Sequence, residues 1–155
     1  NDFIGWLAGR IERMRLAPGL LVFEMSEHGV VQNENAVERL AVALRQAGAG
    51  FAIDHFGVHR NSIALLPRFK PAYLKLAGLH TANVCSDAGT RFLVEAIIRA
   101  ARQLDVPVIA QSVESETQLA ALAALGVAGF QGYLGGTPAP WPRSAADPEG
   151  RRPGA

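Results

Sequence analysis

Five polar side chains occur where short apolar segments of the sequence end: Glu24, Asp54, Lys75, Gln111 and Gln131. If those segments are parallel strands, their carboxyl ends lie at one edge of a sheet, and the loops that follow build a site there. Two carboxylates, an ammonium group and two amides suit the binding of a phosphorylated ligand, with a divalent cation held by Glu24 and Asp54. One polar residue at a strand end is more often a loop anchor or a helix cap, but five in succession predict a site.

The segments that carry these side chains are short, apolar and rich in branched or aromatic residues. Such nearly continuous hydrophobicity is typical of strands that are covered on both faces, as in parallel sheets. We expect Pro107 at a strand entrance because it cannot donate a hydrogen bond to the sheet. The expected strands cover residues 20–25, 51–54, 72–76, 106–111 and 128–133.

Segments with apolar residues at helical spacing lie between the expected strands. Ser115 and Gln118 have the spacing of a capping box. Glycines at positions 48, 50 and 126 fall where helices should stop. The expected helices cover residues 3–14, 37–44 and 92–101, with a shorter one around 119–122.

This alternation predicts right-handed βαβ units around a parallel sheet. An open doubly wound sheet and a (β/α)₈ barrel both satisfy the pattern, although no G-x-G-x-x-G follows the first strand as dinucleotide binding would require. A complete barrel takes about 250 residues, so 155 residues predict an incomplete barrel or a smaller open sheet. Residues 141–155 lack periodicity, and we expect a disordered tail there.

The composition excludes several classes of partner. A formal net charge of +1 gives no attraction of the whole surface for DNA, RNA or an anionic membrane. The apolar runs are far shorter than the roughly 20 residues that span a bilayer. Cys85 is the only cysteine, which excludes an internal disulfide and favours a cytoplasmic location, including the cytoplasmic part of a membrane-anchored protein.

Five segments, in order, resemble motifs of the EAL domain, the cyclic di-GMP phosphodiesterase family. Residues 23–27 (FEMSE) resemble E-I-T-E, 52–57 (AIDHFG) resemble I-D-D-F-G, 73–76 (YLKL) resemble Y-L-K-I-D, 109–114 (IAQSVE) resemble V-A-E-G-V-E, and 130–133 (FQGY) resemble Q-G-Y. The resemblance implies that residues 1–140 are the C-terminal portion of an EAL domain and form an incomplete TIM-type (β/α) barrel. The E-x-L strand and a strand with an Asn ligand would then lie upstream of Asn1, and sheet edges would be exposed.

The same resemblance implies a role for each matching side chain. Glu24 and Asp54 would be ligands of Mg²⁺ or Mn²⁺, and Lys75 would stabilise the phosphate or the nucleophilic water. Glu27 would brace the loop after Asp54, and Glu114 would support the metal site. In active members of the family, two divalent metals activate water to open one phosphodiester.

Three positions depart from the family pattern. His55 replaces the second Asp of D-D, Gln111 replaces the Glu of A-E-G-V-E, and Ala77 replaces the Asp after L-K-I. Because Gln takes up no proton at neutral pH and coordinates cations weakly, we expect no intact catalytic machinery and no efficient hydrolysis. Binding is expected to survive through Lys75, with Gln131 near the nucleotide and less repulsion of a dianionic ligand where His55 and Gln111 replace carboxylates.

The variant motifs look most like EAL domains of the LapD type, which resemble receptors for cyclic di-GMP. We therefore expect a degenerate EAL domain that binds cyclic di-GMP as a signalling module. A weak metal-dependent phosphodiesterase and a structural EAL module that binds no nucleotide are the alternatives. The expected partners are cyclic di-GMP and a protein output partner or other domains of a longer protein, and a homodimer is allowed. His59 and Arg60 are further candidate donors near the site.

Overall fold

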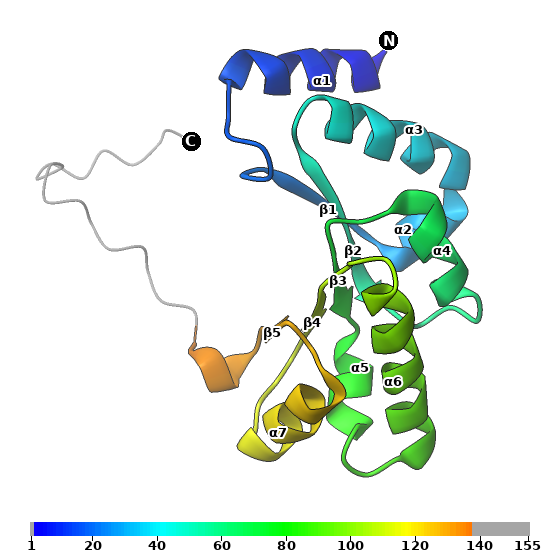
Figure 1. Ribbon diagram of the computed structural model, residues 1–155, viewed down its shortest axis with the longest axis vertical. Helices are drawn as coiled ribbons and strands as arrows, with labels where there is room; N and C mark the ends of the chain where they lie inside the picture. The colour runs from blue at the N-terminus through cyan, green and yellow to red at the C-terminus, as the bar shows by residue number, and fades with distance from the viewer. Residues whose placement is uncertain (1, 138–155) are drawn as a thin grey trace, which may run out of the picture.

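The computed structural model describes residues 2–137, in which helices and strands alternate (Figure 1). The expected tail at 141–155 lies outside the described residues. The strands are β1 (Val22–Ser26), β2 (Gly50–Phe56), β3 (Tyr73–Leu76), β4 (Val108–Ala110) and β5 (Gly129–Phe130). The helices are α1 (Phe3–Met14), α2 (Glu27–Gln32), α3 (Glu34–Gln46), α4 (Ser62–Phe69), α5 (Gly78–Asn83), α6 (Ala88–Arg102) and α7 (Glu116–Leu125), and a 3₁₀ helix covers Tyr133–Gly135.

The strands form one parallel sheet, and their order in space is their order in the chain, β1-β2-β3-β4-β5. In a doubly wound sheet the strand order reverses partway across, whereas a barrel winds in one direction. The observed order therefore confirms the prediction of an incomplete TIM-type barrel and excludes the doubly wound alternative. Within residues 2–137 the sheet is open, with β1 and β5 at its edges.

Among residues 2–137, the helices cover one face of this sheet, and no helix covers the other face (Figure 1). Side chains on the helix side are apolar, partly buried on β1 and buried on β2 and β3. Ile53 and Leu74 have no exposed surface, and the Phe51 ring packs 6.3 Å from that of Phe69 on α4. Because successive side chains of a strand point to opposite faces, the alternate positions of each strand face away from the helices. The polar strand-end residues lie on that second face.

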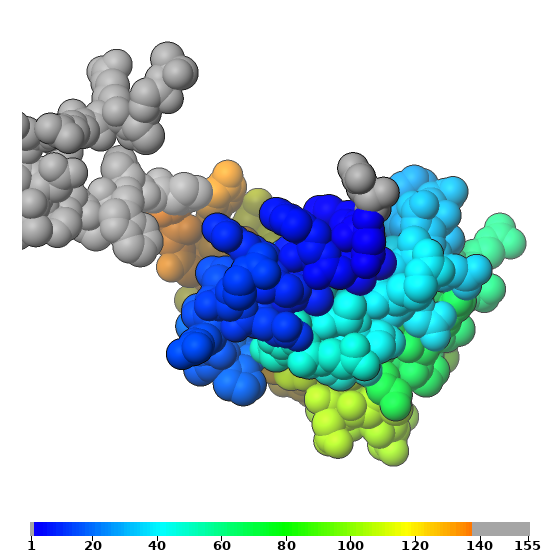
Figure 2. Space-filling view, turned by 90° about the horizontal axis from the view of Figure 1, so that it is seen from above, coloured from blue at the N-terminus to red at the C-terminus, as the bar shows by residue number. Residues whose placement is uncertain are grey.

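Helix positions follow from the apolar spacing and from end signals. Figure 2 shows α1 lying along α3 on the outside of the molecule, where Ile11 of α1 is buried. The predicted capping box of α7 is present, since the Ser115 hydroxyl accepts from Gln118 N and the Gln118 side chain accepts from Ser115 N. Gly126 ends α7 at φ 97°, a backbone conformation that favours glycine.

Some local predictions were wrong or incomplete. Gly50 is the first residue of β2 and does not end a helix. Pro107 precedes β4, as expected, but β4 is shorter than the predicted 106–111. Helices α2, α4 and α5 were not expected, because two of them are six residues long and the third contains Pro67. Among residues 2–137, no helix combines the length and the hydrophobicity that crossing a membrane requires.

Candidate functional site

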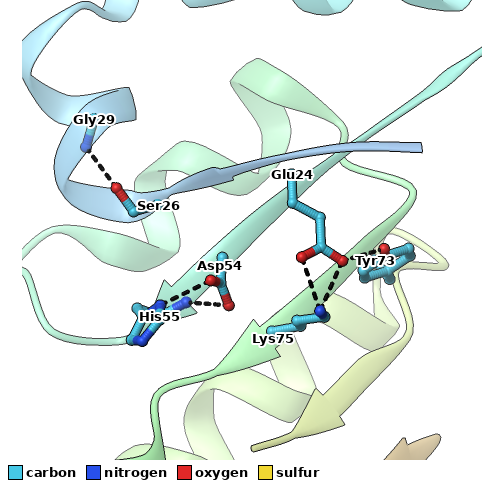
Figure 3. A network of polar contacts seen from close by, with 7 residues as sticks. All are labelled: Glu24, Ser26, Gly29, Asp54, His55, Tyr73 and Lys75. Carbon is cyan, nitrogen blue, oxygen red and sulfur yellow. Dashed lines mark hydrogen bonds and ion pairs between the residues drawn. The ribbon is translucent and has the colours of Figure 1, made fainter. Parts of the chain in front are cut away.

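The centre of the candidate site is a contact between the first and third strands (Figure 3). Lys75 Nζ lies 2.8 Å from the carboxylate of Glu24, and the hydroxyl of Tyr73 donates to Glu24 Oε1 over 2.6 Å. The Lys75 ammonium and then the Tyr73 hydroxyl hold the pKa of Glu24 below its usual value. Burial, followed by the hydrogen bond to Glu24 and then the negative charge of that carboxylate, raises the pKa of Tyr73 to about 12. At neutral pH this group is therefore a carboxylate with two donors, one of them charged.

The register of the sheet explains how these side chains meet. Glu24 is aligned with Ala52 of β2, and Ala52 is aligned with Tyr73 of β3. The three side chains thus share one face, and Lys75, two residues after Tyr73, shares it too. Ala52 is fully buried between the two polar partners. Its methyl group is short enough for Glu24 to reach across β2.

Asp54 lies on the same face, farther along β2, and contacts its own neighbour (Figure 3). Its carboxylate accepts from the backbone N–H of His55 over 2.9 Å and lies 2.8 Å from the imidazole Nδ1 of the same residue. His55 has a φ of 53°, in the left-handed region. The Asp54 carboxylate thus contacts both the backbone and the ring of His55 at this uncommon conformation.

The remaining predicted residues line a separate hollow. Gln111, Glu114 and Gln131 surround a cavity of about 230 Å³ together with Ser112, Gly132 and Tyr133. The Oε1 atom of Gln111 is buried and has no hydrogen-bond partner among the described residues. Of the five strand-end residues, Gln111 and Gln131 line this hollow, and the convergence of all five on one pocket stays a prediction.

A strained turn follows β4 as well. Ser112 has a φ of 56°, which favours glycine and costs another residue about 1 kcal/mol. This position corresponds to the Gly of the V-A-E-G-V-E pattern. Gln111 thus replaces the Glu of that pattern with an uncharged amide. Ser112 replaces the Gly with a residue for which the left-handed backbone conformation is less favourable.

Glu27 has the bracing contact that was predicted for it. The residue is 1% exposed, and its Oε2 accepts from the backbone N–H groups of Val58 and His59 at 2.9 and 3.1 Å. Both amides belong to the loop between β2 and α4. A buried carboxylate from α2 therefore fixes the course of the chain directly after Asp54 and His55.

The described residues do not fit a divalent metal by themselves. Among residues 2–137, no three His, Cys, Asp or Glu side chains converge so as to hold a metal ion. Glu24 is bound by an ammonium group and a phenol, and Asp54 is bound by His55. Mg²⁺ and Mn²⁺ require several oxygen ligands, and the amide that replaces a carboxylate at position 111 is a weak one. The face as it stands is suited to polar and charged contacts with an anionic ligand.

Two side chains at or near this face were missed by sequence reasoning. Tyr73 stands two residues before Lys75, a spacing that places both on one face of a strand, and this signal was available. His28 stacks on His59 with ring centroids 5.8 Å apart. These rings, with Ser26, His55 and Val58, line a hollow of about 530 Å³ beside Glu27. Arg60 lines a neighbouring hollow between the β2–α4 loop and α6.

The sequence model of the EAL domain family matches residues 1–138. The chain is 29% identical over 133 residues to the blue light- and temperature-regulated antirepressor BluF of Escherichia coli, covering 86% of this chain and 33% of BluF. It is 30% identical over 128 residues to the bifunctional diguanylate cyclase/cyclic di-GMP phosphodiesterase MucR of Pseudomonas aeruginosa, covering 83% of this chain and 19% of MucR. The chain thus spans a third or less of the length of these two relatives.

Solved structures give the same relationship. The Vibrio cholerae LapD S helix-GGDEF-EAL protein bound to c-di-GMP superimposes with a TM-score of 0.79 at 32% identity, over 86% of this chain and 32% of that one. The Klebsiella pneumoniae BlrP1 complex with manganese and cyclic di-GMP superimposes with a TM-score of 0.76 at 28% identity, over 86% of this chain and 34% of that one. The neighbours thus include a ligand complex of LapD and a metal complex of BlrP1.

Proposed function

The chain belongs to the EAL domain family, and we propose that it binds cyclic di-GMP on the polar face of its sheet as a signalling module, without efficient hydrolysis. The observation that carries this proposal is the pairing of Glu24 with Lys75 and Tyr73. The charge of the Glu24 carboxylate is met within the protein by the ammonium group of Lys75 and by the Tyr73 hydroxyl. Lys75 remains on the polar face as the cation for a phosphate.

The proposed loss of hydrolysis rests on the departures from the family pattern. Gln111 supplies no carboxylate to hold a metal or accept a proton. Asp54 binds His55, which stands where the pattern has a second Asp. With fewer negative charges on this face, a dianionic ligand is repelled less and a divalent cation is attracted less.

A weak metal-dependent phosphodiesterase is the second candidate. The likeness to a BlrP1 complex with manganese and cyclic di-GMP favours it, together with the retained Glu24, Asp54 and Lys75. In this reading a metal would displace Lys75 from Glu24. The two candidates therefore differ in whether divalent metals strengthen binding.

Signal output would pass to other domains of a longer protein. The S helix-GGDEF-EAL arrangement of the LapD neighbour supports this proposal, because the chain matches only 32% of that protein. A protein partner and a homodimer remain alternatives for the output.

The deciding experiment is calorimetry with cyclic di-GMP on the protein that contains this chain, with and without Mg²⁺ or Mn²⁺, followed by analysis of the nucleotide. We expect binding of similar affinity with and without metal and no linear dinucleotide. Linear product in the presence of metal would favour the phosphodiesterase. Absence of binding under both conditions would favour a structural EAL module.

A further inference from the structure

A buried histidine outside the predicted site contacts the loop that follows Asp54 and His55. His80 lies on α5, directly after β3, and is 4% exposed. Its Nε2 atom lies 2.9 Å from the carbonyl oxygen of Gly57. Because a carbonyl only accepts, Nε2 carries the hydrogen in this contact.

The close approach depends on the backbone at Gly57. This residue has a φ of 98°, and a Cβ atom there would lie 2.9 Å from His80 Nε2 and 2.9 Å from Ile97 Cδ1. Glycine thus provides both the left-handed conformation and the space for the imidazole. The bond joins β3–α5 to β2–α4, two units that are consecutive in the barrel.

The loop is therefore held from two sides. On one side, Glu27 from α2 accepts from the amides of Val58 and His59. On the other side, His80 donates to the carbonyl of Gly57. Both side chains are buried, so water competes little for either bond. An acceptor on α2 and a donor on α5 thus form hydrogen bonds to three consecutive residues, Gly57, Val58 and His59.

From this geometry we propose that His80 is a positioning residue, whose hydrogen bond to Gly57 fixes the β2–α4 loop and, through it, the turn at Asp54 and His55. The consequence for ligand affinity rests on the proposed binding of cyclic di-GMP at the polar face. The positioning of the loop itself is independent of that function. The two parts are therefore measured separately.

The first measurement is hydrogen–deuterium exchange, by mass spectrometry without nucleotide, on the protein that contains this chain. In His80→Leu, uptake in peptides covering residues 55–61 is expected to be about fivefold faster, the factor that one hydrogen bond of ordinary strength provides. His80→Gln, whose amide N–H can replace the donor, is expected to recover at least half of the protection. Peptides covering residues 37–46 of α3 are expected to be unchanged.

Thr81→Val is the matched control. Thr81 is the next residue of α5 and is fully buried, and its hydroxyl has no hydrogen-bond partner among the described residues. The change keeps shape and burial while removing a polar atom, so it should leave exchange in the loop unchanged. Equal uptake in His80→Leu and the wild type, or the same increase in Thr81→Val, would overturn the positioning role.

The second measurement is the affinity of the same variants for cyclic di-GMP. His80→Leu is expected to bind about fivefold more weakly, and His80→Gln to recover most of the affinity. Faster exchange with unchanged affinity would overturn the link from His80 to the ligand. If the wild type binds no cyclic di-GMP, the proposed function fails, while the exchange experiment still decides whether His80 positions the loop.

Discussion

The ammonium group of Lys75 lies 2.8 Å from the carboxylate of Glu24, a residue two strands away in the sheet. The cation expected to meet a phosphate is thus already paired within the protein. In the proposed binding of cyclic di-GMP, the phosphate shares the Lys75 ammonium with Glu24 or replaces this contact, and variants of either residue test that step.

Replacement of Lys75 by Ala is expected to weaken the binding of cyclic di-GMP by about tenfold or more, because hydrogen bonds to charged groups contribute about 1.5–3 kcal/mol. Calorimetry measures the change. Lys70→Ala is the control, since Lys70 is exposed at the end of α4. Unchanged affinity in Lys75→Ala would remove this residue from the ligand site.

Replacement of Glu24 by Gln distinguishes a receptor from a metal enzyme. The change releases Lys75 and removes a negative charge, so metal-free affinity for cyclic di-GMP should rise, by up to about fivefold for a pair that is partly exposed to solvent. If Glu24 served mainly as a metal ligand, the same substitution would lower affinity in Mn²⁺. A decrease measured with metal and no change without it would contradict the receptor proposal.

The raised pKa of Tyr73 predicts a loss of stability at high pH. Tyrosine ordinarily titrates with a pKa of about 10, and the folded protein keeps Tyr73 uncharged until the pH approaches its pKa of about 12. The contribution of Tyr73 to the free energy of unfolding is therefore fully present below the pKa of the unfolded chain, and it is lost as the pH rises from about 10 to about 12. Once Tyr133 is replaced by Phe, the tyrosinate absorbance of this chain reports Tyr73 and should show the late titration. Adding Glu24→Gln to the same variant should shift that titration to lower pH. A titration at the ordinary value would show that burial and Glu24 have no such effect.

Replacement of Ser112 by Gly is expected to increase the free energy of unfolding by about 0.5–1 kcal/mol, because glycine relieves the cost of a left-handed backbone at the expense of some entropy in the unfolded chain. Denaturant unfolding measures the difference. Ser86→Gly is the control: the backbone there does not have positive φ, so no gain is expected. A gain of the same size in both variants would exclude the backbone conformation as the cause.

Much of the fold could be predicted because its signals are local. Five apolar segments marked the strands, and the Ser115–Gln118 pair marked the start of α7. Helix α4 was missed because Pro67 breaks the helical signal although the flanking Leu65, Leu66 and Phe69 are buried in the core. In that case tertiary packing outweighs a local preference.

The sequence predicted which residues belong to the candidate site better than it predicted which of them contact one another. Because the carboxyl ends of parallel strands meet at one edge of a sheet, Glu24, Asp54 and Lys75 could be predicted to lie near one another. Their partners depend on the alignment of β1, β2 and β3, which adds long-range information that no single segment contains. For the same reason the sequence did not reveal the contact between His80 and Gly57, which are separated by 23 positions.

The alignment of Glu24, Ala52 and Tyr73 has a consequence for how this protein tolerates mutation. Ala52 has no chemistry of its own, yet Glu24 reaches Lys75 and Tyr73 only over its methyl group. A larger apolar residue at this position would keep the sheet hydrophobic but would block the contacts of Glu24 with Lys75 and Tyr73. Position 52 therefore tolerates little change in size, because the polar network depends on the small side chain of this alanine and on no functional group of its own.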